Sequence, residues 1–191
     1  MHTDTAERCL PLLRAIDTRL PHGRLIVAID GRCASGKTTL SALLAERYDC
    51  TVFHMDDFFL QTHQRSAERL AQPGENVDHE RFLEEVLLPL SKGESVSYRR
   101  YNCHLGKIEA PVAVVPKKLT VIEGVYSLHR DLAPYYDLKV FSDISADTQR
   151  ARILARNGAE FAQRFFTEWI PLEEKYFAAC AVRERADIIL P

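Results

Sequence analysis

Residues 25–38, LIVAIDGRCASGKT, decide the fold. Residues 25–29 form an apolar run between His22-Gly23 and Asp30-Gly31, and such a run predicts a buried strand. Residues 31–38 match the pattern G-x-x-x-x-G-K-[ST], and residues 37–47 then place leucines on one face of a helix. A strand, a glycine-rich loop and a helix in this order predict a loop that binds phosphate groups.

The chemistry of this loop follows from its residue types. Gly31 and Gly36 permit backbone angles that a Cβ would obstruct, while the loop amides and the helix N-terminus offer donors to an anion. Lys37 adds a full positive charge near the β- and γ-phosphates, and the Thr38 hydroxyl can coordinate Mg2+. The residues expected to bind the nucleotide are Gly31, Ala34, Ser35, Gly36, Lys37, Thr38 and Thr39.

The rest of the chain alternates predicted helices and strands. Further strands are expected at 51–55, 119–123, 138–141 and 186–190, and helices at 4–20, 79–91, 128–134, 146–157 and 160–183. Two β-rich pieces, 95–101 and 111–115, predict a projecting β-hairpin. This order predicts an α/β, three-layer P-loop NTPase fold with a mostly parallel sheet and helices on both faces. No linker divides residues 1–191, so we expect a single domain with an insertion at about 57–117.

Composition limits the classes of function. The 191 residues carry a formal net charge of −2, which provides no global attraction to nucleic acid or to an anionic membrane. The five cysteines form no CxxC pair, so neither a disulfide framework nor a zinc-finger pattern is indicated. No apolar run approaches the ~20 residues that span a bilayer, and the first twenty residues do not resemble a targeting peptide. We therefore expect a cytoplasmic protein.

Acidic residues follow two of the predicted strands. Asp56 and Asp57 come after the second strand, and Glu123 ends the strand at 119–123. Because the carboxyl ends of parallel strands share one edge of the sheet, these side chains are expected near the phosphate-binding loop. Asp56 is the candidate base for an acceptor hydroxyl, and Thr38, Asp56 and Glu123 are the candidate metal residues. Helix capping or turn formation is the structural alternative for each acidic residue.

Several separated motifs resemble the uridine kinase-like branch of P-loop kinases, which also holds relatives of phosphoribulokinase and bacterial pantothenate kinase. Asp56-Asp57-Phe58-Phe59 is similar to the family's Asp-Ser-Phe-Tyr segment, and Asn76-Val77-Asp78-His79 to its Asn-Phe-Asp-His-Pro segment. The resemblance runs from about residue 24 to the end of the chain. It implies that Asp56 is the catalytic aspartate and that Asp78 binds the ribose diol of an acceptor.

The same resemblance assigns a substrate-binding hairpin and a lid. Tyr101 and His104 resemble the tyrosine and histidine that hold the base in uridine kinases, although Asn102 replaces the aspartate after that tyrosine. Arg152 and Arg156 lie four residues apart in a segment that resembles the lid helix, expected at about 146–160. Such arginines can neutralise charge on the transferring phosphoryl group. Residues 157–160 read NGAE where uridine kinases have Arg-Gly-Arg.

Together these features predict a kinase that moves the γ-phosphate of ATP, with Mg2+, onto a hydroxyl of a nucleoside-like acceptor. Pantothenate, a sugar phosphate and nicotinamide riboside are the alternative acceptors. A regulatory NTPase without an acceptor is the alternative class, but none of the three asparagines precedes a lysine as in the guanine-binding Asn-Lys-x-Asp. The expected partners are ATP and a small molecule, with no nucleic acid polymer and no membrane. A homo-oligomer is compatible with the sequence.

Overall fold

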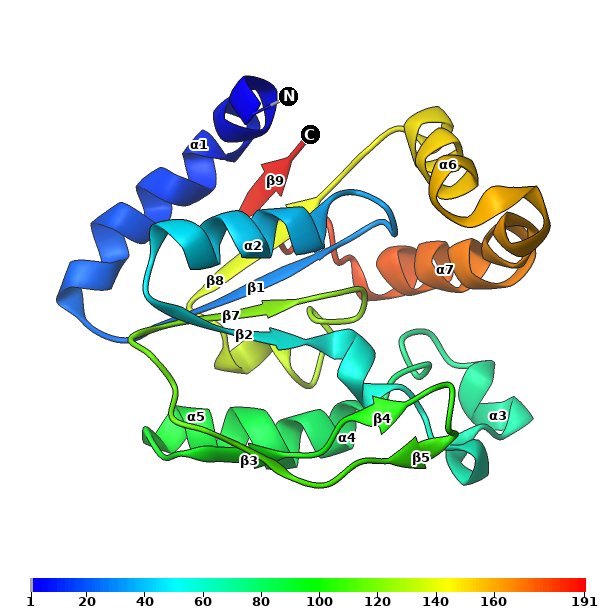
Figure 1. Ribbon diagram of the computed structural model, residues 1–191, viewed down its shortest axis with the longest axis horizontal. Helices are drawn as coiled ribbons and strands as arrows, with labels where there is room; N and C mark the ends of the chain where they lie inside the picture. Colours follow the sequence, from blue (N-terminus) through cyan, green and yellow to red (C-terminus); the bar gives the residue numbers. More distant parts are fainter. Residues whose placement is uncertain (1) are drawn as a thin grey trace.

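The computed structural model describes residues 2–191, with side chains from residue 7 onward, and has a five-stranded parallel sheet at its centre (Figure 1). The strand order is β2-β7-β1-β8-β9. The strands are β1 (Leu25–Gly31), β2 (Cys50–His54), β7 (Leu119–Glu123), β8 (Leu138–Ser142) and β9 (Ile188–Leu190). β1 lies between β7 and β8, with Val27 opposite both Val121 and Leu138. The three-layer P-loop fold expected from the sequence is therefore present.

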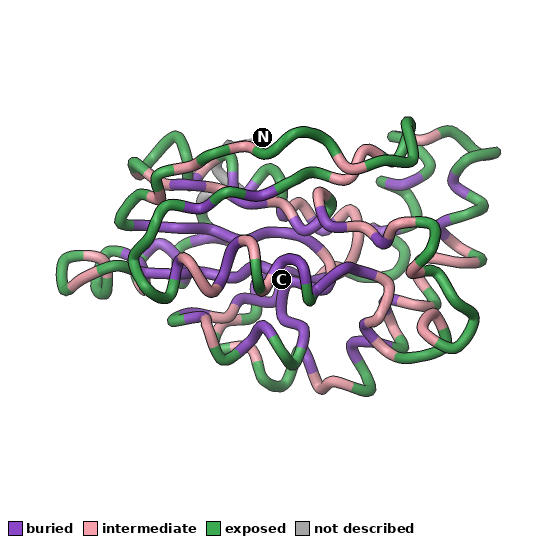
Figure 2. Tube along the Cα trace, turned by 90° about the horizontal axis from the view of Figure 1, so that it is seen from below, coloured by how far each residue is buried: buried purple, intermediate pink, exposed green. Residues whose placement is uncertain are grey.

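Helices cover both faces of the sheet, which explains why β1 is buried along its whole length and apolar from Leu25 to Ile29. Leu25, Val27 and Ile29 point toward α1 (His2–Arg19) and α2 (Lys37–Arg47) and join the core cluster that these helices close. Ile26 and Ala28 point to the opposite face and join the larger core cluster. Figure 2 shows the buried strands running through the middle of the molecule.

A long excursion connects β2 to β7. It contains the short helices η2 (Met55–Phe58), η3 (Thr62–Gln64) and α3 (Ala67–Leu70), then the continuous helical run α4 (His79–Phe82), η4 (Leu83–Leu87) and α5 (Leu88–Lys92). The predicted hairpin follows as two short antiparallel pairs. These are β3 (Val96–Tyr98) with β6 (Val112–Val114), and β4 (Tyr101–Asn102) with β5 (Lys107–Ile108).

The helix predicted at 128–134 is wrong. The chain after β7 turns, and only the short η5 (Ala133–Tyr135) forms there. The backbone N–H groups of Tyr126 and Leu128 donate instead to the carboxylate of Asp30, and Tyr126 has a φ of 73°. A buried carboxylate that binds these amides fixes a turn where periodicity alone favoured a helix.

The last two helices lie at the carboxyl ends of the strands (Figure 1). α6 (Ala146–Arg164) is interrupted at Gly158, whose φ of 73° and ψ of 164° are not helical. This break lies between the two helices predicted from the sequence. η6 (Phe165–Trp169) and α7 (Ile170–Cys180) follow, and α7 ends three residues before the predicted boundary, where Ala181 has a φ of 47°. Among the described residues no helix combines the length and apolar character needed to cross a membrane.

Asp30 ties these elements together. Its buried carboxylate accepts hydrogen bonds from the backbone N–H groups of Gly31, Tyr126 and Leu128 and from the hydroxyl of Tyr176 on α7. Burial raises the pKa of this carboxyl, and the surrounding donors oppose that rise. The end of β1, the turn after β7 and α7 therefore meet at one side chain.

We expect Tyr176→Phe to lower the free energy of unfolding by about 1.5–3 kcal/mol, because it removes one donor from a buried carboxylate. Tyr136→Phe is the matched control. The Tyr136 hydroxyl is buried without a hydrogen-bond partner in the described part of the chain, so its removal should be neutral or stabilising. Urea unfolding of both variants measures the contrast. Equal losses would show that the hydroxyl of Tyr176 contributes nothing specific.

Candidate functional site

The phosphate-binding loop connects β1 to α2 at the centre of the sheet edge. Gly31 has a φ of 136°, and a Cβ there would lie 2.1 Å from the carbonyl oxygen of Ser142 on β8. Gly31 is therefore required by close approach to the neighbouring strand as well as by its backbone angle. Gly36, with a φ of 95°, caps the start of α2. Its surroundings leave room for a Cβ, so backbone conformation alone favours glycine there.

Lys37 lies inside the loop, with only 7% of its surface exposed. Its Nζ donates to the carbonyl oxygens of Gly31 at 2.7 Å and Arg32 at 2.9 Å. Thr38 and Thr39, which follow on the first turn of α2, are exposed. The predicted loop residues thus place one buried ammonium group and two accessible hydroxyls at the helix N-terminus.

Oxygen-bearing side chains gather beside Thr38. The Thr38 hydroxyl donates to Oε1 of Glu123 at 3.3 Å, and Glu123 is 5% exposed at the end of β7. Asp56 follows β2 and keeps an exposed surface, yet nearby protein limits its solvation. This desolvation raises the pKa of Asp56, and the negative charge of Glu123 raises it further. The structure therefore brings the three predicted metal residues into one region.

This donor set fits Mg2+. It offers a hydroxyl and two carboxylates, which are the hard oxygen ligands that Mg2+ prefers. Asp56 and Glu123 repel each other because both carry negative charge. A divalent cation bound there would neutralise that charge.

His54 belongs to the same region and was not predicted. Its Nδ1 lies 2.6 Å from Oε1 of Glu123, and this hydrogen bond raises the pKa of His54 above its ordinary value. His54 and Glu123 are register partners on the neighbouring strands β2 and β7. The available signal was that His54 lies one residue before the end of the predicted strand 51–55 and that Glu123 ends the predicted strand 119–123. Their pairing could not be predicted without the strand order.

Helix α6, which contains the segment predicted as a lid, contacts the loop through Arg152 and Gln149. Arg152 donates from Nη1 to the carbonyl oxygen of Ala34 at 3.0 Å, and Gln149 donates to the carbonyl oxygen of Cys33 at 3.2 Å. Arg156, the other predicted lid arginine, is exposed and donates to the side chain of Asn157 at 3.0 Å. Arg152 is therefore in place against the loop, and Gln149 is a contact that the sequence did not indicate.

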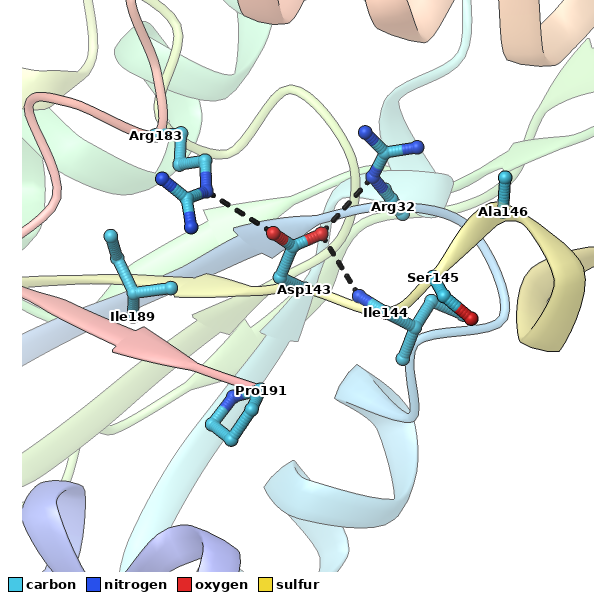
Figure 3. A pocket seen from close by; sticks show the side chains of 8 residues that line it. All are labelled: Arg32, Asp143, Ile144, Ser145, Ala146, Arg183, Ile189 and Pro191. Atoms are coloured by element: carbon cyan, nitrogen blue, oxygen red, sulfur yellow. Dashed lines mark hydrogen bonds and ion pairs between the residues drawn. The ribbon is translucent and has the colours of Figure 1, made fainter.

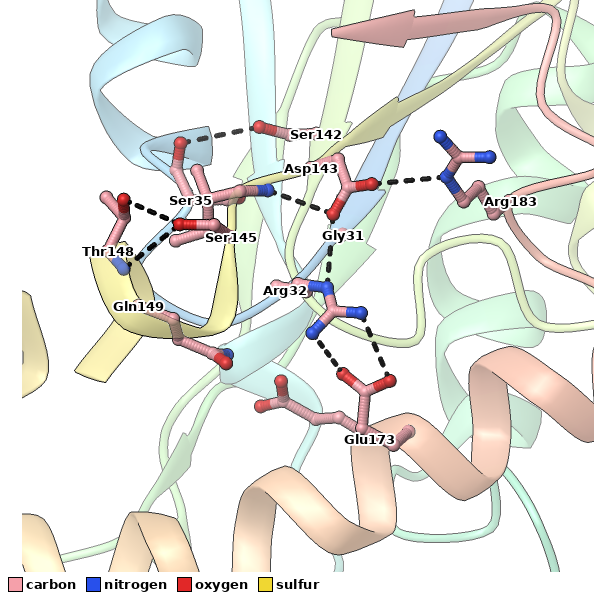
Figure 4. A network of polar contacts seen from close by, with 12 residues as sticks. Gly31, Arg32, Ser35, Ser142, Asp143, Ser145, Thr148, Gln149, Glu173 and Arg183 are labelled. Carbon is pink, nitrogen blue, oxygen red and sulfur yellow. Dashed lines mark hydrogen bonds and ion pairs between the residues drawn. The ribbon is translucent and has the colours of Figure 1, made fainter. Parts of the chain in front are cut away.

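Glu173 on α7 also approaches the loop (Figure 4). The carboxylate of Glu173 accepts a hydrogen bond from the backbone N–H of Cys33 at 3.0 Å, and Glu173 is 5% exposed. Burial raises the pKa of Glu173 to about 7, and the Cys33 hydrogen bond and the Lys37 charge only partly oppose this. Glu173 lies 140 positions from Cys33 in the sequence, so no local pattern could have predicted the contact.

The predicted acceptor residues are spread over α4 and the hairpin. Asp78 is 3% exposed, caps α4 by accepting from the backbone N–H of Arg81 at 3.3 Å, and forms an ion pair with Nε of Arg81 at 3.1 Å. Tyr101 on β4 is half-buried, and His104 is exposed in the turn between β4 and β5. Burial raises the pKa of Cys103, and the charge of Asp56 adds to this, which places the turn near Asp56.

A pocket of about 470 Å³ lies on the other side of the loop (Figure 3). Asp143 holds Arg32 and Arg183 on its two oxygens, each at 3.1 Å. The remaining lining comes from the β8–α6 connection and from the C-terminal strand. The lining residues are Arg32, Asp143, Ile144, Ser145, Ala146, Arg183, Ile189 and Pro191.

We expect Glu173→Gln to remove a pH-dependent loss of stability. The pKa of Glu173 in the folded protein is raised above the ordinary 4.5. The stabilising contribution of Glu173 to the free energy of unfolding is therefore fully present below about pH 4.5 and is lost as pH rises through about 7. The free energy of unfolding of the wild type should therefore fall, relative to the variant, by roughly 3 kcal/mol across that window. Unfolding at several pH values measures this, with the exposed Glu160→Gln as control. Parallel curves for wild type and Glu173→Gln would contradict it.

Comparison with known proteins places this geometry in a family. Residues 26–164 match the model of the phosphoribulokinase / uridine kinase family. A phosphoribulokinase from Synechocystis is 27% identical over 142 residues, covering 71% of this chain and 42% of that protein. A chloroplastic uridine/cytidine kinase from Arabidopsis thaliana is 25% identical over 203 residues, covering 92% of this chain and 39% of that protein. The chain thus spans about two fifths of the length of these curated relatives.

Solved structures show the same fold over nearly the whole chain. A possible uridine kinase from Bacillus stearothermophilus has a TM-score of 0.74 at 22% identity, covering 99% of this chain and 100% of the other. A candidate fructose transport system kinase from Silicibacter sp. TM1040 has a TM-score of 0.69 at 27% identity, covering 97% and 98%. With its phosphate-binding loop, its strand-end carboxylates and the match over residues 26–164, the chain belongs to the phosphoribulokinase / uridine kinase family.

Proposed function

We propose that this chain is an ATP-dependent kinase that transfers the γ-phosphate of ATP to a hydroxyl of a small, nucleoside-like acceptor. The observation that carries the proposal is the convergence of Lys37, Thr38, Glu123 and Asp56 at the carboxyl ends of β1, β7 and β2. In an open parallel sheet this edge is where ligands bind. Family membership supports the same class of reaction.

Residues 31–39 bind the triphosphate in this proposal. The amides at the start of α2 and the ammonium of Lys37 supply positive charge along the phosphate chain. Thr38, Glu123 and Asp56 would hold Mg2+, which, when bound, neutralises charge developing on the phosphate oxygens. His54 keeps Glu123 oriented through its 2.6 Å contact.

Asp56 is the proposed base. It lies beside Glu123 and near the β4–β5 turn, and its raised pKa makes it a better proton acceptor than an isolated aspartate. It would orient the acceptor hydroxyl for in-line attack and take its proton as the new bond forms. Its partial exposure leaves room for the acceptor.

Arg152 and Arg156 belong to the proposed lid, about residues 146–160. Arg152 contacts the loop at Ala34, so its guanidinium would lie close to phosphate groups bound by the loop. Closure by these arginines would exclude water and limit hydrolysis of ATP without transfer.

The pocket beside Arg32 is the proposed site for the nucleotide base. It is continuous with the phosphate-binding loop through Arg32 and with the C-terminal strand through Ile189 and Pro191 (Figure 3). A purine stacked near the guanidinium groups of Arg32 or Arg183 would gain cation–π contact.

The acceptor lies between Asp78, Tyr101 and His104 in this proposal, within the excursion at about 57–117. The uridine/cytidine kinase relative supports a nucleoside. The alternative is another small alcohol, such as a sugar or sugar phosphate. This alternative is favoured by the ion pair that Asp78 already forms with Arg81 and by the 27% identity to the candidate fructose transport system kinase. A cytoplasmic location is proposed together with either acceptor.

Asp56→Asn should lower kcat by about 10²–10⁴-fold, because an amide cannot accept the acceptor's proton. Nucleotide binding should persist, since the loop residues are unchanged, whereas Lys37→Ala should weaken both binding and turnover. Coupled ATP-consumption kinetics and nucleotide titration measure the two effects. Asp49→Asn, an exposed carboxyl on the turn before β2, is the control. Undiminished turnover in Asp56→Asn would remove this residue from the mechanism.

A screen of purified protein with ATP against nucleosides, pantothenate, sugar phosphates and nicotinamide riboside tests the acceptor. We expect a nucleoside monophosphate as product, identified by mass. Asp78→Asn keeps the oxygen that can cap α4, and it should raise the KM for a ribonucleoside more than it lowers kcat. Equal use of ribo and 2′-deoxy acceptors would contradict a diol contact, and phosphorylation of sugars alone would favour the alternative.

A further inference from the structure

Three side chains outside the proposed catalytic site form a compact cluster. Glu75, His79 and His129 each offer one ligand atom, and these atoms all lie within 4.8 Å of one another. Nε2 of His79 is 3.1 Å from Oε2 of Glu75, and Nε2 of His129 is 3.8 Å from Oε1 of the same carboxylate. The two imidazole rings are stacked with centroids 4.0 Å apart. Both Nε2 atoms therefore face one carboxylate.

The two histidines of this cluster are buried, Glu75 is half-buried, and the polar groups are incompletely paired. His129 is 0% exposed, and its Nε2 has no hydrogen-bond partner among the described residues. Buried nitrogens are normally paired, so an unpaired imidazole nitrogen that faces a carboxylate marks a place where a cation can bind.

Asp131 lies on the opposite side of both rings. Its Oδ2 is 3.8 Å from Nδ1 of His79 and 3.8 Å from Nδ1 of His129. Carboxylates in this position orient histidine ligands and favour the tautomer that leaves Nε2 free for a metal. The backbone N–H of Asp131 also donates to Nδ1 of His129 at 3.3 Å, which favours the other tautomer in the protein without metal. Coordination at Nε2 would move that proton to Nδ1 with no net proton release, and Nδ1 would then give up the hydrogen bond from the Asp131 backbone N–H and donate to the Asp131 carboxylate.

The surrounding charge allows a cation. Glu75, Glu80 and Asp131 are the carboxylates around the rings. Arg69 lies 3.5 Å from Glu75 but 2.7 Å from Glu80, so its stronger partner is Glu80. Arg130 is 65% exposed, and its charge is screened by solvent.

We propose that Glu75, His79 and His129 form a site for a divalent transition-metal cation, with Zn2+ as its best match. Two imidazoles and one carboxylate suit Zn2+, whereas Mg2+ and Ca2+ prefer oxygen ligands alone. A metal there would connect the segment before α4, which carries Asp78, to the turn that follows β7. The site is separate from Thr38, Asp56 and Glu123, and it does not depend on the proposed kinase function.

Calorimetric titration of chelator-treated full chain with ZnCl2 tests the site. We expect one tight Zn2+ per chain that excess Mg2+ does not displace, and a rise in Tm on binding. Co2+ in its place should give visible absorption bands of a site with nitrogen and oxygen ligands. His129→Gln and Glu75→Gln should each weaken binding by at least about 100-fold, and Asp131→Asn by about 10–100-fold, as for removal of an outer carboxylate.

Matched controls separate this cluster from other zinc ligands. His63→Gln changes an exposed histidine on η3, and Cys103→Ser changes the exposed cysteine, so both should bind Zn2+ as the wild type does. Asp131 is half exposed, so Asp131→Asn should fold even if the buried variants do not, and circular dichroism checks each fold. Absence of binding to the wild type, or undiminished binding by His129→Gln and Asp131→Asn, would overturn the proposal. Such undiminished binding would place Zn2+ at Glu123 or at a cysteine.

Discussion

The site depends on one buried carboxylate. Asp30 ends the apolar part of β1 and accepts three backbone hydrogen bonds and one from Tyr176. A buried charge is costly unless donors surround it, so the chain segments that carry those donors are held in fixed positions. They are the start of the phosphate-binding loop, the turn after Glu123 and the middle of α7. The loop, the strand-end carboxylate and the helix that carries Glu173 therefore keep their relative geometry through a group that is not expected to touch substrate.

Acidic side chains lie on two sides of the phosphate-binding loop. On the side of β2 and β7, the charge of Glu123 adds to the desolvation that raises the pKa of Asp56, and the charges of Lys37 and His54 oppose this rise. On the other side, Glu173 is held against a loop amide with its pKa raised to about 7. Lys37 lies between these two sides and lowers the pKa of both Asp56 and Glu173. A polyphosphate with a divalent cation would bring negative charge to the loop and positive charge to the carboxylates, which is the complement of this arrangement.

The strand, loop and helix at residues 25–47 could be predicted because their signals are local and agree with one another. The meeting of Thr38 with Glu123 also followed, since parallel strands end at one edge. The helix expected at 128–134 failed because a distant carboxylate, Asp30, binds the amides of that turn. The contacts of Glu173, and the pairing of His79 with His129, needed tertiary structure, because no sequence period relates residues so far apart.

The path of the chain separates two halves of the molecule. β1, α2, β8 and the C-terminal elements enclose the loop, while everything between His54 and Leu119 leaves the sheet after one edge strand and re-enters at its immediate neighbour. Because that departure and return use adjacent strands, replacing the intervening segment alters no strand order and threads nothing through the sheet. The stretch beyond Asp57 can therefore change in length without reordering the sheet, whereas Asp56 and the core side chains of α4 and η4 stay tied to the strands that they pack against.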